Sequence, residues 1–182
     1  VRSFVARALG ITKSYDTFEP LKTLLSDHDE GVRTNAVHSI AMIDDKKVES
    51  LLINALKDKS VYVREAAACA LTEKCNPNGI GELIQILRHP NWVKVKIVHD
   101  LLTRTTNQEI DKRKVDEWEK WWDKEKKTFN LNRYQQIKPH LTVGRKAFFD
   151  NDFKKAIREY ETILSIWPDH HFTLNRLVST FN

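Results

Sequence analysis

Residues 52–71 read LINALKDKSVYVREAAACAL, and residues 21–40, which read LKTLLSDHDEGVRTNAVHSI, carry the same apolar and charged positions. The two copies are 31 residues apart, with leucine, valine, arginine and alanine at matching places. A further copy runs from Leu83 to Leu101, and its second half arrives one residue early. Self-similarity at a fixed period of this size is typical of a stacked repeat protein.

Each copy contains two runs of apolar residues at helical spacing. The copy that includes residues 52–71 has Val48 and Leu52 in one run, which begins before the quoted stretch, and Val63 and Ala67 in the next. Two such runs separated by a short break predict a helical hairpin. Helices of about 12 residues are marginal alone in water, so each hairpin must bury its apolar face on its neighbours. The sequence therefore predicts an all-α fold, an α-α superhelix (solenoid) of stacked hairpins.

The break between the two helices of each copy carries a residue suited to cap the second helix. These predicted N-cap residues are Asp29, Ser60 and Asn91. A short polar side chain at this place accepts a hydrogen bond from a free backbone N–H of the first helical turn. We therefore expect the second helix of each hairpin to begin just after these residues.

The pattern Leu-x3-Leu-x-Asp-x4-Val-Arg-x3-Ala-x3-Leu of residues 52–71 resembles the short HEAT-type repeat of interaction scaffolds and of phycobilin-lyase-like proteins. The resemblance covers residues 1–109. It implies that aspartate and arginine side chains tie neighbouring hairpins together. The pairs implied are Asp27 with Arg33 and Asp58 with Arg64. The last copy carries His89 and Lys94 at these places, so we expect the ladder to end before it.

The sequence begins in the middle of a repeat. Val1 lies 31 residues before Val32, and Val1 to Leu9 match the second helix of a copy. We therefore expect a fragment of a longer repeat array, or an end cap that lies outside this sequence. No secretory apolar region and no apolar run of about 18 residues is present. A cytoplasmic location is the default expectation, which a targeting signal outside this sequence would change.

The net charge of +5 is unevenly distributed. Residues 1–110 hold 15 basic and 14 acidic residues, whereas residues 111–182 hold 15 and 11. In the second part the two signs alternate along the chain, which at helical spacing predicts a solvated, salt-bridged face. Nucleic-acid binding usually needs basic residues clustered on one surface. The charge pattern therefore argues against a nucleic-acid partner.

Residues 110–137 break the repeat period and carry three tryptophans. Trp118, Trp121 and Trp122 can share one stripe of a helix. One interpretation is that the indoles cover the open end of the HEAT stack. The other is an exposed aromatic platform for a partner. The Trp-x2-Trp-Trp signature is similar to the terminal element of bacterial HEAT-repeat proteins, which favours the covering role and a capping or linker helix here.

Residues 138–182 follow a second pattern, with small and aromatic residues at tetratricopeptide (TPR) spacing. The matching residues are Gly144, Ala147, Phe153, Ala156, Tyr160, Ile163, Leu164 and Pro168. The segment resembles one tetratricopeptide hairpin at Lys138–Ile166, followed by a helix at Phe172–Thr180. Asn151 stands where glycine is usual.

The tetratricopeptide resemblance implies a peptide-binding face on the first helix of the hairpin. The positions that match this face are Leu141, Arg145, Phe148 and Phe149. The clamp that some members use for acidic tails needs lysine and asparagine over three repeats, so one hairpin does not support it. The sequence leaves open whether one phenylalanine lines a groove or both pack on the Trp-rich helix.

No arrangement of residues in the sequence predicts catalysis or a cofactor. The seven histidines form neither a His-Glu dyad nor a His-x3-His pair, and no Gly-rich phosphate loop or nucleophile elbow is present. Cys69 and Cys75 are expected to be reduced thiols packed as small apolar residues. We therefore expect a protein that is not an enzyme and holds no metal or cofactor.

The repeat predicts a row of side chains along the second helices, which line the concave side of HEAT-type stacks. Together with the TPR-like face, the candidate partner-binding residues are His38, Asn35, Glu65, Lys96, His99, Arg145 and Phe149. Their mixed chemistry favours a protein or peptide partner over a phosphate track. The sequence predicts a non-enzymatic interaction scaffold. The alternative is a nucleic-acid-binding HEAT protein of the alkylpurine DNA glycosylase type, and a pigment-attaching lyase would rest on fold analogy alone.

Overall fold

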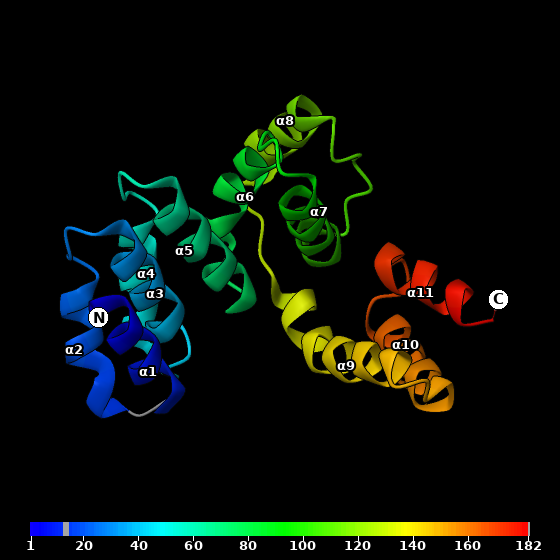
Figure 1. Cartoon of the computed structure of the whole chain (residues 1–182). Coiled ribbons are helices and arrows are strands. Elements are labelled where there is room, and N and C mark those ends of the chain that lie inside the picture. Colours follow the sequence, from blue (N-terminus) through cyan, green and yellow to red (C-terminus); the bar gives the residue numbers. More distant parts are fainter. Residues whose placement is uncertain (13–14, 182) are drawn as a thin grey trace. The chain divides into compact units, whose positions relative to one another are not determined.

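The computed structural model describes residues 1–12 and 15–181, and within these ranges all regular structure is helical (Figure 1). The helices are α1 (Arg2–Thr12), α2 (Phe18–Leu24), α3 (Glu30–Ile40), α4 (Lys46–Ala55), α5 (Val61–Glu73), α6 (Ile80–Ile86), α7 (Trp92–Thr106), α8 (Val115–Glu125), α9 (Asn132–Phe149), α10 (Phe153–Ile166) and α11 (His171–Phe181). Two short 3₁₀ turns, η1 (Tyr15–Thr17) and η2 (Pro77–Gly79), precede α2 and α6. The predicted all-α repeat fold is confirmed.

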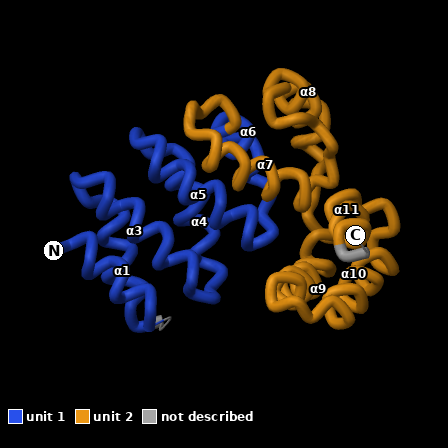
Figure 2. Tube along the Cα trace, turned by 45° about the vertical axis from the view of Figure 1, so that its right-hand side comes forward, with its two compact units in different colours: residues 1–86 blue, residues 87–182 orange. Residues whose placement is uncertain are grey.

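The chain divides into two compact units, residues 1–86 (unit 1) and residues 87–182 (unit 2), drawn in different colours in Figure 2. Unit 1 contains α1 to α6, and unit 2 contains α7 to α11. This division separates the parts of the chain that each pack mainly on themselves. The division by repeat type, at residues 109 and 137, stays a prediction.

Unit 1 is a row of helical hairpins. The second helices of successive copies, α1, α3 and α5, lie side by side, and each packs on the next (Figures 1 and 2). The first helices join this row, because α2 packs on α3 and α4 packs on α5. The 31-residue spacing of the sequence therefore appears in space as a stack of equivalent hairpins.

The repeated apolar positions form the core of unit 1. Leu21 and Leu52 occupy the same place in successive copies, and both side chains are fully buried. The same holds for Ala36 and Ala67, which face inward on α3 and α5. Burying a leucine stabilises the fold by about 1.5–3 kcal/mol. Each hairpin obtains this stabilisation only by covering the apolar face of its neighbour.

Charged side chains tie successive hairpins of unit 1 together, although with partners other than those the resemblance implied. Arg33 binds the Asp58 carboxylate of the following copy with two hydrogen bonds of 2.8 and 2.9 Å. Arg33 meets residue 27 only through the backbone carbonyl of Asp27, at 2.8 Å. The Asp27 carboxylate instead pairs with Arg2 of the preceding copy at 2.8 Å.

The end of this ladder also differs from the expected pairing of Asp58 with Arg64. Arg64 reaches the Asp58 backbone carbonyl at 3.0 Å, and its ion pair is with Glu82 on α6 at 3.0 Å. The three ion pairs therefore all run in the same direction along the chain, because each arginine pairs with a carboxylate of the next copy. In the last step glutamate replaces aspartate as the partner.

All three predicted N-cap residues stand directly before their helices, and two of the three side chains make the predicted capping bond. Asp29 accepts a hydrogen bond from the Val32 backbone N–H at 3.0 Å, and Asn91 caps α7 in the same way. Ser60 stands at the N-cap of α5 as predicted, but its side chain makes no capping bond. Its hydroxyl donates to the Glu30 carboxylate at 2.6 Å, and so links α5 to α3.

In unit 2, α9 and α10 form the helical hairpin that the second sequence pattern predicts, with α11 packed on α10. The predicted start at Lys138 is wrong by six residues, because α9 begins at Asn132 and continues through Pro139. The turn between the helices places Asn151 at φ 60°. This is the left-handed region, which glycine and then asparagine adopt most readily. Asn151 therefore adopts the backbone conformation for which glycine is usual at this position.

Gly144 permits the close approach of α9 and α10. A Cβ at this position would lie 2.8 Å from Cε1 of the fully buried Tyr160 ring. Overpacking of this kind costs about 1–3 kcal/mol, and the higher helix propensity of alanine offsets about 1 kcal/mol. We expect Gly144→Ala to lower the free energy of unfolding of the hairpin by roughly 1 kcal/mol. Thermal unfolding followed by circular dichroism measures this change, and an unchanged or raised melting temperature would contradict the packing.

Candidate protein-binding surface

Three of the predicted site residues lie in unit 1, on α3 and α5. His38 is exposed, and partial desolvation lowers its pKa below the usual histidine range. Asn35 is half-buried, and its Nδ2 donates to Ser3 Oγ at 2.6 Å and to the Gly31 carbonyl at 2.8 Å. Glu65 is only 9% exposed. Of the three, His38 offers the most side chain to a partner.

Two further predicted residues lie on α7 in unit 2, and only one of them has a solvent-exposed side chain. Lys96 is exposed. His99 is half-buried, its Nε2 lies 2.7 Å from the Ile110 carbonyl oxygen, and its ring meets the Trp118 indole edge-on at 6.1 Å. His99 therefore holds the segment after α7 against the α7–α8 core.

The Trp-rich helix α8 is largely committed to packing within unit 2. The Trp118 side chain is fully buried, so this indole is part of the core. Trp121 and Trp122 are half-buried, and both pack edge-on against the Phe129 ring, at 5.4 and 5.7 Å. An aromatic platform made of all three indoles is therefore ruled out by the burial of Trp118.

The last two predicted residues lie one helical turn apart on α9. Phe149 is 69% exposed and packs edge-on against Phe148 at 5.8 Å. Arg145 is half-buried, and its pKa is lowered first by this burial and then by the charges of Arg104 and Arg176. Leu141, which the resemblance also assigned to this face, is 3% exposed and belongs to the core.

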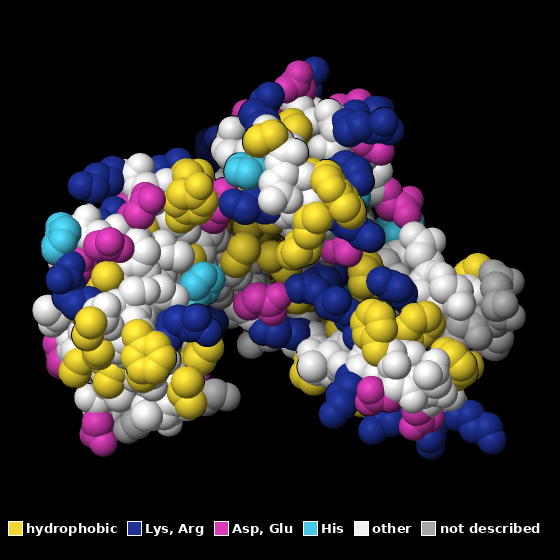
Figure 3. All heavy atoms as spheres, in the orientation of Figure 1, with side chains coloured by type: hydrophobic (Ala, Val, Ile, Leu, Met, Phe, Trp, Pro, Cys, Tyr) yellow, Lys and Arg dark blue, Asp and Glu magenta, His cyan; other side chains and the backbone are white. Residues whose placement is uncertain are grey.

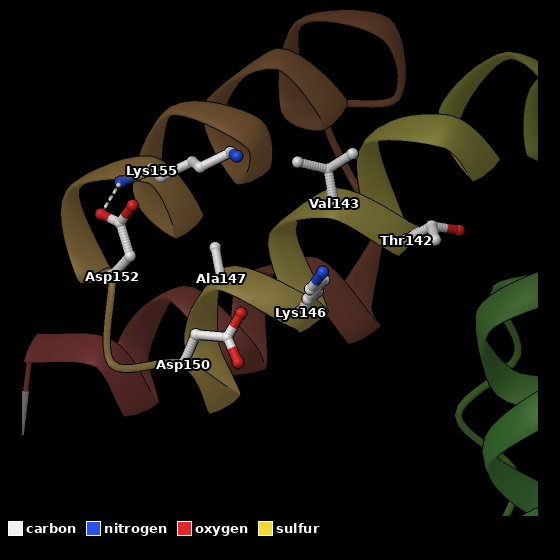
Figure 4. Close-up of a pocket in the computed structure, with 7 residues that line it drawn as sticks. All are labelled: Thr142, Val143, Lys146, Ala147, Asp150, Asp152 and Lys155. Atoms are coloured by element: carbon white, nitrogen blue, oxygen red, sulfur yellow. Dashed lines mark hydrogen bonds between the residues drawn. The ribbon is translucent and has the colours of Figure 1, made fainter.

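Beside this face, an open pocket of about 410 Å³ lies between the end of α9 and the start of α10 (Figure 4). Its lining residues are Thr142, Val143, Lys146, Ala147, Asp150, Asp152 and Lys155. The Asp152 carboxylate caps α10 by accepting the Lys155 backbone N–H at 3.1 Å. Apolar walls flanked by two lysines and two aspartates suit a peptide segment with a polar backbone and small side chains. Because the two positive and two negative charges balance, charge alone does not select a ligand for this pocket.

This pocket was not predicted from the sequence, although the sequence contains a signal for it. Val143, Lys146 and Asp150 recur at helical intervals of three and four residues, one stripe beside the predicted face. In Figure 4, Val143 and Ala147 lie on the side of α9 that faces α10. From the sequence alone this stripe looks like ordinary solvent-facing surface, because the pocket forms only where α10 packs beside it.

The described residues hold no group of three His, Cys, Asp or Glu side chains arranged to bind a metal ion. None of the helices in residues 1–12 and 15–181 has both the length and the apolar character needed to span a membrane. Neither Cys69 nor Cys75 forms a disulfide bond.

Comparison with known protein families finds a match for one part of the chain. Residues 1–52 match the family described as HEAT repeats. No curated protein matches the chain significantly. The match covers α1, α2, α3 and most of α4, and the same helical packing continues to α5. The sequence match and the helical stack together support a helical repeat protein of HEAT type.

Proposed function

We propose that this protein is a non-enzymatic interaction scaffold whose helical-repeat surfaces bind protein or peptide segments. The observation that carries the proposal is the HEAT-repeat match at residues 1–52, combined with the row formed by α1, α3 and α5. HEAT repeats are commonly protein-interaction scaffolds. A stack of equivalent hairpins offers a repeated surface to an extended partner.

The chemistry of the open side chains supports a protein partner. His38, Lys96 and Phe149 are exposed and differ in kind, and Arg145 is half-buried beside Phe149. A groove that reads extended segments combines apolar pockets with a few polar contacts. Exposed phenylalanine and half-buried arginine beside a pocket form such a combination on the α9–α10 hairpin. We assign this hairpin to the tetratricopeptide type, with the HEAT-type array at residues 1–109 and a linking helix at 110–137.

Peptide selection by the purified chain tests the scaffold function. A displayed library of extended peptides is selected on the full chain, and the affinity of the selected sequences is measured by isothermal titration calorimetry. We expect saturable binding without any change in the covalent structure of the peptide. Salt-dependent binding of duplex DNA with release of alkylated purines, or selection of no peptide at all, would contradict the proposal.

Phe149→Ala is expected to weaken peptide binding about tenfold, because an exposed aromatic anchor contributes at least about 1.4 kcal/mol to such an interface. The side chain is 69% exposed, so the variant keeps the wild-type melting temperature. Phe4→Ala is the matched control, since Phe4 is 76% exposed on α1 and lies outside the hairpin. Equal affinities for wild type and Phe149→Ala would remove the hairpin from the binding surface.

A further inference from the structure

Within unit 2, a compact set of hydrogen bonds joins the end of α7 to the start of α11 (Figure 1). Asn107, directly after α7, donates from Nδ2 to the Asp169 carbonyl at 2.8 Å. Its Oδ1 accepts the His171 backbone N–H, also at 2.8 Å. His170 stands between these two partners, and its Nε2 lies 2.9 Å from the Arg104 carbonyl oxygen. We call this set of contacts the α11 junction.

The His170 ring is completely buried in the junction and makes a hydrogen bond with each nitrogen. It has no exposed surface, and it packs on the Trp167 ring at 4.9 Å. A carbonyl oxygen only accepts, so Nε2 must carry the hydrogen that binds the Arg104 carbonyl. Nδ1 lies 2.7 Å from Thr173 Oγ1 and therefore accepts the threonine hydroxyl. The neutral ring, in this one tautomer, satisfies both bonds.

A second proton on His170 would disturb the junction at two points. Nδ1 would become a donor, so the Thr173 hydroxyl would have to turn its own hydrogen away. Thr173 is fully buried, and its hydroxyl makes no other hydrogen bond among residues 1–12 and 15–181. The new charge would also be held away from water, which is costly. The closed junction therefore favours the neutral ring.

The charged groups near His170 do not reverse this preference. Burial is the largest influence, and it lowers the pKa of His170. The hydrogen bond to the Arg104 carbonyl and the charge of Asp169 raise the pKa, and the charge of His171 lowers it. The net direction is down, so the closed form holds its proton less tightly than an exposed histidine does.

Two further charged groups lie at the edge of the junction. On α9, the Arg133 guanidinium lies over the Trp167 ring at 5.9 Å and adds positive charge there. The Glu109 carboxylate lies 3.6 Å from the His171 ring and would hold His171 more tightly once that ring is protonated. The His171 side chain is 41% exposed, so solvent screens this opposing attraction.

The sign of the pH dependence follows from the lowered pKa. When the junction opens, His170 meets water and regains a pKa of about 6.5. The open form then binds more protons than the closed form. Docking of α11 is therefore at full strength above about pH 6.5 and weakens as the pH falls below it.

We propose that the α11 junction is a proton-sensitive latch, which holds α11 against α7 while His170 is neutral and releases α11 when His170 takes up a proton. The released element is α11 alone, which packs on α10 and on α7. The α9–α10 hairpin stays folded, because these two helices pack on each other through Gly144 and the buried Tyr160 ring.

Release of α11 would uncover part of the proposed peptide-binding face, and in this respect the inference rests on the proposed scaffold function. On α11, the Arg176 guanidinium lies over the Phe148 ring at 5.8 Å. Phe148 in turn packs edge-on against the exposed Phe149. Figure 3 shows apolar side chains gathered over the region of α9 and α11. An open latch therefore enlarges the apolar surface beside Phe149.

Amide hydrogen exchange of the full chain at pH 7.5 and pH 5.5, corrected for the intrinsic exchange rate at each pH, tests the latch. We expect the opening constant of the α11 amides to rise about tenfold between these values, as an open-state pKa of about 6.5 implies. The amides of α9 and α10 keep their opening constants. Equal opening constants of α11 at the two pH values, or an equal acid response of α9 and α10, would overturn the proposal.

His170→Gln is the decisive variant, because glutamine can donate to the Arg104 carbonyl and accept from Thr173 but does not titrate. It should abolish the acid response of α11, and this ratio of opening constants is informative even if the variant is less stable. His171→Gln changes the neighbouring, partly exposed histidine and is the matched control, which keeps the response. An undiminished response in His170→Gln would overturn the latch.

Asn107→Gly tests the junction without touching a titrating group. Asn107 has a φ of 58°, which glycine adopts freely, so the variant removes the two amide bonds and keeps the backbone path. We expect α11 to open about tenfold more readily at both pH values, with the acid response retained. Wild-type protection of α11 in this variant would show that the junction does not hold the helix.

Peptide binding at the two pH values separates the latch from the scaffold function. Peptides selected on the chain should bind up to about tenfold more tightly at pH 5.5 than at pH 7.5, and equally at both in His170→Gln. An affinity that stays constant while α11 opens would remove the control of binding by the latch. Acid opening of α11 in a chain that selects no peptide keeps the latch and removes the scaffold function.

Discussion

Ala67→Asp is expected to unfold unit 1. Ala67 has no exposed surface and lies on α5 among the apolar side chains that α3, α4 and α5 share. A carboxylate placed there has no partner, and an uncompensated buried charge costs about 3–5 kcal/mol. This is a large share of the 5–15 kcal/mol that typically separates the folded and unfolded states of a domain. The repeat stack therefore loses most of its folded population.

Urea unfolding followed by circular dichroism measures the effect of Ala67→Asp, with Ala8→Asp as the matched control. Ala8 is an exposed alanine on α1, so the same substitution meets water there and changes stability little. An Ala67→Asp protein that unfolds at the wild-type urea concentration would contradict the packing of α5. Equal losses in the two variants would also contradict it, because burial would then not distinguish the positions.

Asp58→Ala is expected to be the next most damaging change. Arg33 and Asp58 form a two-bond ion pair between successive copies, with only 6% and 14% of their side chains exposed. Removing the aspartate leaves the guanidinium buried without its anion. The cost is about 3–5 kcal/mol for a fully buried pair, and less here because Asp58 is partly exposed. The matched double variant Arg33→Met with Asp58→Leu recovers much of the loss, since two apolar side chains leave no unpaired charge.

The pH dependence of the folding stability also tests the contribution of the Arg33–Asp58 ion pair. The hydrogen bond from Arg33 is the main cause that lowers the pKa of Asp58, while burial opposes the shift. A carboxyl whose folded-state pKa is depressed stabilises the fold above its unfolded pKa of about 3.9, and this stabilisation is lost as pH falls through the folded pKa. The stability difference between wild type and Asp58→Ala should shrink below about pH 4. A difference that stays constant down to pH 2 would show that the carboxylate charge contributes nothing.

The sequence predicted the repeat core well, because periodic apolar residues are the direct cause of helix packing. Leu21, Leu52 and Ala67 were assigned to the core from spacing alone, and all three are fully buried. It placed Ser60 correctly at the N-cap of α5 but predicted the hydrogen bond of its side chain incorrectly, because the competing partner, Glu30, lies 30 residues away on a neighbouring hairpin. Local capping rules describe one helix end and contain no information about which carboxylate tertiary packing brings near.

The candidate site was harder to predict, for the same physical reason. The pattern placed Arg145 and Phe149 on one helix, and the structure leaves Phe149 exposed and Arg145 half-buried there. A partner-binding role for each predicted residue stays a prediction.

Amide hydrogen exchange of the full chain tests most directly whether successive hairpins stabilise one another. If they do, the core amides of α3 and α5 exchange through one shared opening, with equal opening free energies. Asp58→Ala should then lower both by the same amount, because the Arg33–Asp58 pair joins the two hairpins. Loss of protection in α5 alone, with α3 exchanging as in the wild type, would contradict the account.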